Sequence, residues 1–187
     1  MAVYTHIDDD HLAALLAQYD IGAALACEGI SEGVENTNYK LTTPAGRFIL
    51  TIFEKRVAEA DLPFFMTAME QLAQRGFPAP RPVAMRDGGY LSEAHGKPAA
   101  IVTFLDGAWP RTWDARHCAA VGEAMARMHT ALADLEAERP NGLRVDGWEA
   151  LLRPRLAQAE ALRPGLAVLI ECDMREEIGR ASCRERV

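Results

Sequence analysis

Residues 38–53, NYKLTTPAGRFILTIF, contain two apolar segments of strand length on either side of a Pro-Ala-Gly turn. Turns of this composition between apolar runs are typical of β-hairpins. The pattern predicts strands at residues 38–42 and 47–53, joined by a turn at residues 44–46. A third apolar segment, residues 24–30, precedes them, so we expect an antiparallel meander of three strands.

The sequence EGVENT, residues 32–37, lies between the first two predicted strands and is rich in residues that tolerate positive φ. Such a loop can turn several backbone N–H groups toward one point, where they bind an anion such as a nucleotide phosphate. A single glycine also fits an ordinary solvated hairpin turn. The loop alone therefore leaves both interpretations open.

Helices are predicted on both sides of the meander. Residues 8–19 begin with aspartates that suit a helix N-terminus and continue with leucines at helical spacing. Residues 57–75 carry an apolar stripe at spacings of three and four. The prolines of residues 78–83, PAPRPV, favour an extended chain. Residues 88–105 then predict two strands around a turn at residues 95–97.

The sequence after Leu105 changes from strands to helices. Residues 106–113, DGAWPRTW, predict a short linker. Helical sequence follows at residues 114–135, 148–161 and 166–176. Strands with one helix, followed by helices alone, indicate an α+β architecture with two lobes, residues 1–105 and residues 106–176.

Composition and charge limit the classes of function. With 187 residues, 49% of them hydrophobic and 25% charged, the chain has the profile of a soluble globular protein. A net charge of -7 argues against general binding to nucleic acids or anionic membranes. The acidic N-terminus predicts no signal peptide, and no apolar run approaches a membrane span. Four scattered cysteines predict free thiols in a reduced, cytoplasmic compartment and no zinc site.

Residues 177–187, EIGRASCRERV, lack apolar periodicity and break the helical pattern before them. The segment resembles the translation of a short sequencing adapter. We therefore expect a non-native tail and leave it out of the fold prediction. A disordered basic tail is the alternative.

The order of predicted elements is that of a kinase fold, in which a flexible loop covers the ATP phosphates and the adenine binds at the interlobe linker. Four stretches carry a closer resemblance: EGVENTNYKL, GRFILTIFEKR, LPFFMTAMEQLAQRGFPAPRPV and HCAAVGEAMARMHTAL. Together they resemble bacterial homoserine kinases of the type related to aminoglycoside and choline phosphotransferases, over essentially all of residues 1–176. The resemblance implies a protein-kinase-like α+β fold, with an antiparallel-sheet N-lobe, one packed helix and the start of a helical C-lobe. It also implies transfer of the ATP γ-phosphate to the homoserine hydroxyl, which yields O-phosphohomoserine for threonine biosynthesis.

The resemblance implies a nucleotide site in two parts. The phosphate-covering loop matches Gly33, Glu35, Asn36, Thr37 and Asn38. The strand whose backbone would bond the adenine edge matches Thr103, Phe104 and Leu105, for which simple burial in an edge strand is the alternative. Thr51 stands where the wider superfamily carries a phosphate-binding lysine. Lys40, Arg47 and Lys55 are candidates to replace that charge, although each also suits a solvated surface. The complete enzyme would use ATP, Mg²⁺ and L-homoserine, with neither nucleic acid nor membrane as a partner.

Four further residues have weaker assignments. Glu59 and Glu70 could orient a cation, but a solvated helix face suits both better. His129 is expected to be a core residue that bonds backbone near the catalytic loop. Asp106 fits either a contact with ribose or the amino-acid substrate, or the capping of a turn.

No catalytic residue or metal ligand is assigned. The family carries an H-G-D-x-x-x-x-N segment and a later D-F/Y segment for the acceptor hydroxyl and Mg²⁺, and neither string occurs in this sequence. We therefore expect an N-terminal fragment of a homoserine kinase, inactive as written, whose long helix exposes an apolar stripe. Two alternatives stay open: a related kinase acting on choline or an aminoglycoside, and a non-catalytic nucleotide-binding or interaction module.

Overall fold

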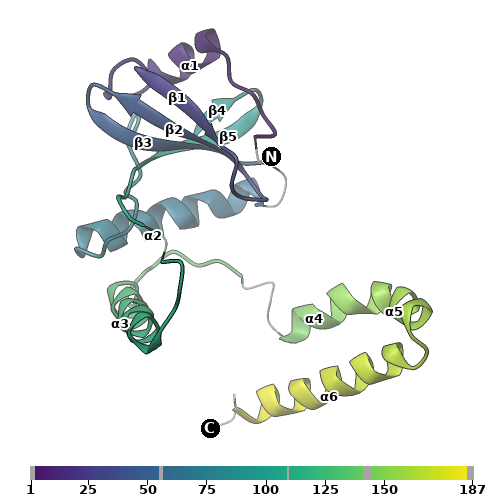
Figure 1. Ribbon diagram of the computed structural model, residues 1–187. Coiled ribbons are helices and arrows are strands. Elements are labelled where there is room, and N and C mark those ends of the chain that lie inside the picture. Colours follow the sequence, from purple (N-terminus) through teal and green to yellow (C-terminus); the bar gives the residue numbers. More distant parts are fainter. Residues whose placement is uncertain (1–2, 55–56, 109, 141–144, 185–187) are drawn as a thin grey trace. The chain divides into compact units, whose positions relative to one another are not determined.

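The computed structural model describes the backbone of residues 3–54, 57–108, 110–140 and 145–184. Side chains are described for the same residues except 145–146 and 177–184. The chain forms two compact units, Met1–Glu138 and Arg139–Val187, which we call the N-terminal unit and the C-terminal unit. In Figure 1 the C-terminal unit contains the helices coloured light green to yellow.

The N-terminal unit contains a five-stranded antiparallel sheet with the strand order β1-β2-β3-β5-β4. The meander predicted around residues 38–53 is confirmed, because β2 pairs with both β1 and β3 in antiparallel register. Gly46 closes the β2–β3 hairpin with a φ of 139°, a value that non-glycine residues rarely adopt. The strands are β1 (Ala26–Ile30), β2 (Thr37–Thr43), β3 (Gly46–Ile52), β4 (Ser92–Ala94) and β5 (Lys97–Thr103).

Two helices cover opposite faces of the sheet, α1 above it and α2 below it in the view of Figure 1. α1 (Asp9–Leu16) begins after Asp8, whose carboxylate accepts a hydrogen bond from the backbone N–H of His11 at 2.9 Å. This cap satisfies one of the free N–H groups of the first turn, as the aspartates of the sequence predict.

The second helix begins later than the sequence predicts. A 3-10 turn, Glu59–Asp61, precedes α2 (Leu62–Gln74). Pro63 lies in the first turn of α2, where the N–H that proline lacks would have no partner within the helix. The predicted helix at residues 57–75 is therefore confirmed in kind, with a shorter regular part.

The main hydrophobic core lies between the sheet and α1. Strand geometry sends every second side chain to this face, and Leu41, Leu50, Ile52 and Ile101 are fully buried there. They pack against side chains from α1 and its flanks, namely Ile7, Leu12, Leu15, Leu16, Tyr19 and Ile21. The opposite face, which we call the α2 face, carries half-buried side chains at the alternate positions, namely Asn38, Lys40, Ile49, Thr51 and Val102.

The segment after β5 leads into α3 (Ala115–Ala131), which Asp114 caps by accepting hydrogen bonds from two backbone N–H groups. α3 is tied to α2 near its C-terminal end, where Gln71 Nε2 donates to the carbonyl oxygen of Ala131 at 3.0 Å. Val121 and Met125 are exposed, so the predicted exposed apolar stripe is confirmed. The expectation that His129 is a core residue was wrong: its side chain is exposed. Helical periodicity marks an apolar face but does not say whether another element covers it.

The C-terminal unit is helical, and its first predicted helix is interrupted. Pro154 lies in a 3-10 turn, Arg153–Arg155, that separates two short helices, because proline cannot donate the hydrogen bond that a continuous helix needs. The helices of this unit are α4 (Val145–Leu152), α5 (Leu156–Leu162) and α6 (Leu166–Arg184). Among the described residues, no helix combines the length and the apolar composition that a membrane span requires.

The backbone of α6 continues to Arg184, beyond the helix end predicted at residue 176. The side chains of residues 177–187 and the backbone of residues 185–187 lie outside the described residues, so the adapter origin of this segment stays a prediction. The three cysteines with described side chains, Cys27, Cys118 and Cys172, are free thiols.

Candidate nucleotide-binding site

The loop between β1 and β2, residues 31–36, projects from the end of the sheet with Val34 exposed. Gly33 adopts a φ of 117°, and a Cβ added there would meet no other atom within 4 Å. The glycine is therefore required by its backbone conformation and not by close packing. Glu35 is also exposed in this loop. A loop with this conformation can direct backbone N–H groups outward, although phosphate binding by it stays a prediction.

Two asparagines fix the C-terminal end of the loop to the sheet. Asn36 Oδ1 accepts a hydrogen bond from the backbone N–H of Glu54 at 3.4 Å, and Asn38 Nδ2 donates to the Asn36 carbonyl oxygen at 3.5 Å. Across the β2–β3 ladder, Thr51 Oγ1 donates to Asn38 Oδ1 at 2.8 Å. Thr51 thus supports the loop through Asn38, but it brings no positive charge to the position of the superfamily lysine.

Thr37 differs from the other loop residues, because its side chain belongs to the core. It is fully buried, and its hydroxyl donates to Glu54 Oε1 at 2.7 Å. The Thr37 hydroxyl oxygen, Oγ1, also accepts hydrogen bonds from the backbone N–H groups of Tyr4 at 2.9 Å and Thr5 at 3.0 Å. Strand alternation places Thr37 and Asn38 on opposite faces, so only the backbone of Thr37 can approach a ligand on the α2 face.

Two of the three residues predicted to bond the adenine edge, Thr103 and Phe104, already use their backbone N–H groups within the fold. The Thr103 N–H donates to the Arg81 carbonyl oxygen at 2.9 Å, and the Phe104 N–H donates to the Arg47 carbonyl oxygen at 3.1 Å. No hydrogen bond from the Leu105 N–H is found within the described ranges, and Leu105 is exposed. Of the three N–H groups predicted to bond an adenine edge, only that of Leu105 has no partner among the described residues.

An apolar row on the α2 face connects the loop end of the sheet with the linker end. Ile49 and Val102 are neighbours across β3 and β5, and both are half-buried. Asn38 and Thr51 lie on the loop side of this row, and Phe104 lies on the linker side. The face thus offers a polar end near the loop, an apolar middle and a backbone donor beyond it.

This arrangement lies within the region that a family model, described as "Phosphotransferase enzyme family", matches at residues 26–184. The chain belongs to this family. The homoserine kinase of Rhodospirillum rubrum is 50% identical over 174 residues, which are 93% of this chain and 54% of that protein. The homoserine kinase of Hyphomonas neptunium is 52% identical over 166 residues, which are 89% and 51% of the respective chains. The chain thus spans about half the length of the curated relatives it matches.

Solved phosphotransferases share the fold at low sequence identity. Spectinomycin phosphotransferase, solved in complex with ADP and spectinomycin, matches with a TM-score of 0.57 and 12% identity over 83% of this chain and 48% of that chain. An aminoglycoside phosphotransferase from Alicyclobacillus acidocaldarius matches with a TM-score of 0.57 and 14% identity over 96% of this chain and 52% of that chain. The predicted kinase-like α+β fold is therefore confirmed.

Two of the candidate phosphate-binding cations lie beside the linker. Arg47 Nη2 donates to both carboxylate oxygens of Asp106, at 2.9 and 2.8 Å, and its guanidinium carbon is 4.8 Å from the centre of the Phe104 ring. Lys40 Nζ is 6.0 Å from the centre of the same ring. Asp106 is thus an ion-pair partner, a role that the sequence did not suggest. The third candidate, Lys55, lies outside the described residues.

Glu70 was predicted to lie on a solvated helix face, and that prediction was wrong. Its side chain is only 14% exposed and forms an ion pair with Arg81, with hydrogen bonds of 2.8 and 3.1 Å. These bonds from Arg81 lower the pKa of Glu70, although burial opposes the shift. The Arg81 backbone N–H donates to Thr103 Oγ1 and its carbonyl oxygen accepts from the Thr103 N–H, so the ion pair ties α2 to the end of β5. Glu59 is exposed, as predicted.

Sequence reasoning missed a partly buried polar cluster on the α1 face, formed by Thr5, Thr37, Glu54 and Lys97. Lys97 and Glu54 form an ion pair, with side chains 34% and 11% exposed. Lys97 Nζ donates to Thr5 Oγ1 at 2.6 Å, and Thr5 Oγ1 donates to Glu54 Oε1 at 2.7 Å. Only the alternation that buries Thr37 signals this cluster in the sequence, because Glu54 and Lys97 are far apart along the chain.

The Glu54 cluster predicts a pH dependence of stability. Burial raises the pKa of Glu54, but hydrogen bonds from Lys97, Thr5 and Thr37 outweigh burial and lower it. A carboxyl group with a lowered folded-state pKa stabilises the fold above its ordinary pKa of about 4.3, and this stabilisation is lost as the pH falls. We expect Glu54→Gln to lower the unfolding free energy by about 2–3 kcal/mol at pH 7 and by much less near pH 3. Urea unfolding of both proteins at several pH values measures the difference, and a pH-independent difference would contradict the assignment.

A group of metal-binding side chain types lies away from the candidate site. Among the described residues, Asp8, His11 and His95 place one ligand atom each within 4.8 Å of one another. All three are exposed, and His11 Nδ1 is already hydrogen-bonded to Asp8 at 2.7 Å. Mg²⁺ prefers oxygen ligands, so this histidine-rich group does not suit the metal of phosphoryl transfer.

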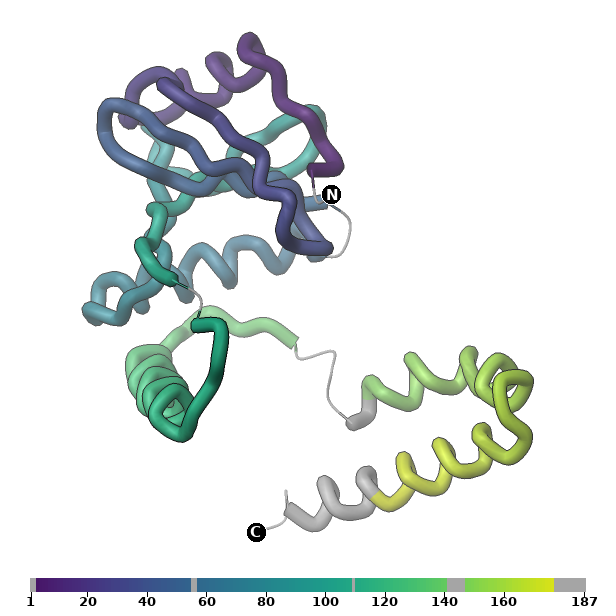
Figure 2. The backbone as a smooth tube through the Cα atoms, viewed as in Figure 1, coloured from purple at the N-terminus to yellow at the C-terminus, as the bar shows by residue number. Residues whose placement is uncertain are grey.

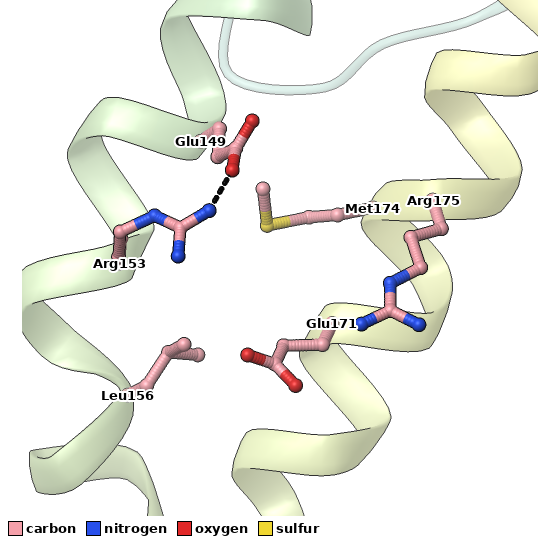
Figure 3. A pocket seen from close by; sticks show the side chains of 6 residues that line it. All are labelled: Glu149, Arg153, Leu156, Glu171, Met174 and Arg175. Atoms are coloured by element: carbon pink, nitrogen blue, oxygen red, sulfur yellow. Dashed lines mark hydrogen bonds and ion pairs between the residues drawn. The ribbon is translucent and has the colours of Figure 1, made fainter.

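The C-terminal unit has a charged pocket of about 150 Å³ between α6 and the segment from α4 to α5 (Figure 3). Its lining residues are Glu149, Arg153, Leu156, Glu171, Met174 and Arg175. Figure 3 shows the Glu149–Arg153 ion pair on one wall and Glu171 with Arg175 on the other. Groups of both charges suit a small zwitterion, but none of the sequence-predicted site residues lines this pocket.

Proposed function

We propose that the N-terminal unit is the nucleotide-binding lobe of an ATP-dependent small-molecule kinase. The observation that carries this proposal is the arrangement of the α2 face. The Gly33 loop lies at one end of an apolar row, and Leu105, whose N–H has no partner among the described residues, lies at the other. Membership of the phosphotransferase family supports the same function.

In this proposal ATP lies along the α2 face. The adenine edge accepts a hydrogen bond from the Leu105 N–H, and the base packs against Ile49 and Val102. The phosphates then reach the loop at Gly33, where backbone N–H groups stabilise their negative charge. Asn38 and Thr51 hold the loop end in place through their mutual hydrogen bond.

The acceptor in the complete protein is proposed to be L-homoserine. Relatives that are 50% identical over 174 residues are homoserine kinases, whereas the similar antibiotic phosphotransferases share only the fold. The reaction transfers the γ-phosphoryl group of ATP to the side-chain hydroxyl, with loss of the hydroxyl proton to a base, and yields ADP and O-phosphohomoserine. Bound Mg²⁺ would neutralise charge on the phosphates. No residue of this chain is assigned to bind Mg²⁺ or to act as the base. We also propose that the protein works in the cytoplasm.

A choline or aminoglycoside kinase remains the closest alternative, and titration of the complete protein with each acceptor separates these from homoserine. A non-catalytic nucleotide-binding module is the alternative from another class. It would bind ADP as well as the kinase lobe does, but no acceptor would stimulate turnover in any form of the protein.

Leu105 provides the test of nucleotide binding. Leu105→Pro removes the backbone N–H, whereas Leu105→Ala keeps it, so the two variants isolate that donor from the side chain. We expect ADP to bind the proline variant at least about tenfold more weakly than the alanine variant, because one hydrogen bond in a desolvated site is lost. Calorimetric titration of the folded proteins measures this. Equal affinities would refute the assigned donor, and absence of ADP binding to the unsubstituted chain would refute the proposed function.

A further inference from the structure

Four side chains from separate segments meet at the C-terminal end of the β1–β2 loop. Thr5 comes from the N-terminal segment and Thr37 from the first position of β2. Glu54 follows β3 by two residues, and Lys97 is the first residue of β5. Both carboxylate oxygens of Glu54 are used, since Oε1 accepts from the Thr5 and Thr37 hydroxyls and Oε2 accepts from Lys97. No polar group of this cluster is left without a partner.

The cluster holds the loop directly. The backbone N–H of Glu54 donates to Asn36 Oδ1, and the Glu54 side chain accepts from the Thr37 hydroxyl. Glu54 is therefore hydrogen-bonded to two successive residues at the loop end. The N-terminal segment is also bonded to the loop, because the Tyr4 hydroxyl donates to the Val34 carbonyl oxygen at 3.4 Å. Figure 2 shows this segment running beside the loop.

The energetics favour a rigid arrangement. Glu54 is 11% exposed, so its charge depends on Lys97 and on the two hydroxyls for stabilisation. A partly buried network in which each polar group has a partner restricts the geometry of the groups around it. The cluster lies on the α1 face, whereas Asn38 and Thr51 lie on the α2 face. Neither Glu54 nor Lys97 can therefore touch a nucleotide on the α2 face.

We infer that Glu54 and Lys97 are positioning residues for the phosphate-binding loop. Their ion pair holds Asn36 and Thr37 so that the backbone N–H groups around Gly33 face the phosphates of the nucleotide. This inference rests on the proposed nucleotide-binding function. It predicts that the pair affects recognition of the phosphates and not of the adenine, which binds at the far end of the sheet face.

Comparison of ADP with adenosine tests this inference on the 187-residue chain. In Glu54→Gln and in Lys97→Met, we expect ADP to bind about tenfold more weakly, the effect of about one lost charge-assisted hydrogen bond. Adenosine should keep its affinity within about twofold, because it lacks the phosphates that the loop would contact. The double variant should be no weaker than the single variants, since both remove the same pair. Lys97→Arg, which keeps the charge, should retain more of the ADP affinity than Lys97→Met.

The control is Asp20→Asn, which breaks an exposed ion pair with Arg86 in the same unit and should change neither affinity. All measurements are made well below the unfolding midpoint of each variant. Equal losses for ADP and adenosine would show a general structural role, and unchanged ADP affinity would show no role; either result overturns the inference.

Hydrogen exchange separates failure of this inference from failure of the proposed function. We expect Glu54→Gln to speed exchange of the backbone amides of residues 33–37 at least about tenfold more than exchange of amides in the middle of β3, which follow only the loss of global stability. This measurement needs no ligand. A chain that binds no nucleotide would refute the proposed function, and unchanged exchange at residues 33–37 would refute the positioning role.

Discussion

Replacement of Leu50 by alanine is expected to destabilise the N-terminal unit by about 3–5 kcal/mol. Leu50 is 0% exposed in the middle of β3, where it lies between Tyr39 of β2 and Ile101 of β5. The substitution removes apolar contacts and leaves a cavity that neighbouring strands cannot fill, because the ladder fixes their positions. We expect the unfolding midpoint in urea to fall sharply. Hydrogen exchange of the backbone amides in β2, β3 and β5 should become faster as well.

Leu25→Ala is the matched control. Leu25 lies in the same unit directly before β1, but its side chain is 69% exposed. Its backbone N–H donates to the Thr42 carbonyl oxygen at 2.8 Å, and the substitution leaves this bond intact. We expect a loss below about 0.5 kcal/mol. Similar losses for both variants would show that the core does not lie between the sheet and α1.

The fold of the N-terminal unit was predictable because its signals are local. The Pro-Ala-Gly turn and the alternating residues around it specify the β2–β3 hairpin within residues 38–53. Such signals leave strand ends uncertain, and β2 begins and ends one residue beyond its predicted bounds. The alternation of residues along β2 also predicts which side of the sheet each side chain faces. Thr37 is two residues before Tyr39 and four before Leu41, so it lies on the same buried face.

The parts of the site that the sequence did not reveal depend on contacts between distant segments. Leu105 differs from its neighbours only because the N–H groups of Thr103 and Phe104 donate to the carbonyl oxygens of Arg81 and Arg47. Both of these acceptors come from other segments of the chain. The ion pair of Glu54 with Lys97 also joins separate segments, the residues just after β3 and the start of β5. A charge pattern along the chain cannot show such pairs, because each partner alone resembles a solvated surface residue.

The largest expected effect concerns turnover. We expect the 187-residue chain to bind ADP yet to release no ADP from ATP in a homoserine-dependent way. Phosphoryl transfer requires a residue that accepts the hydroxyl proton and carboxylates that hold Mg²⁺. The H-G-D-x-x-x-x-N and D-F/Y strings that supply them in the family do not occur in this sequence. A rate at least about 10⁴-fold below that of a complete homoserine kinase is therefore expected.

A coupled assay of ADP release, with O-phosphohomoserine detected by mass spectrometry, measures this rate. The homoserine kinase of Rhodospirillum rubrum, of which the matched residues cover 54%, is the active control. Homoserine-dependent ADP release by the 187-residue chain would show that its own residues supply the base and the metal site. Addition of a segment carrying both strings should restore turnover if the N-terminal unit already holds ATP in a productive position. If ADP binding persists but no such extension restores turnover with homoserine, choline or an aminoglycoside, the chain is a nucleotide-binding module and not a kinase lobe.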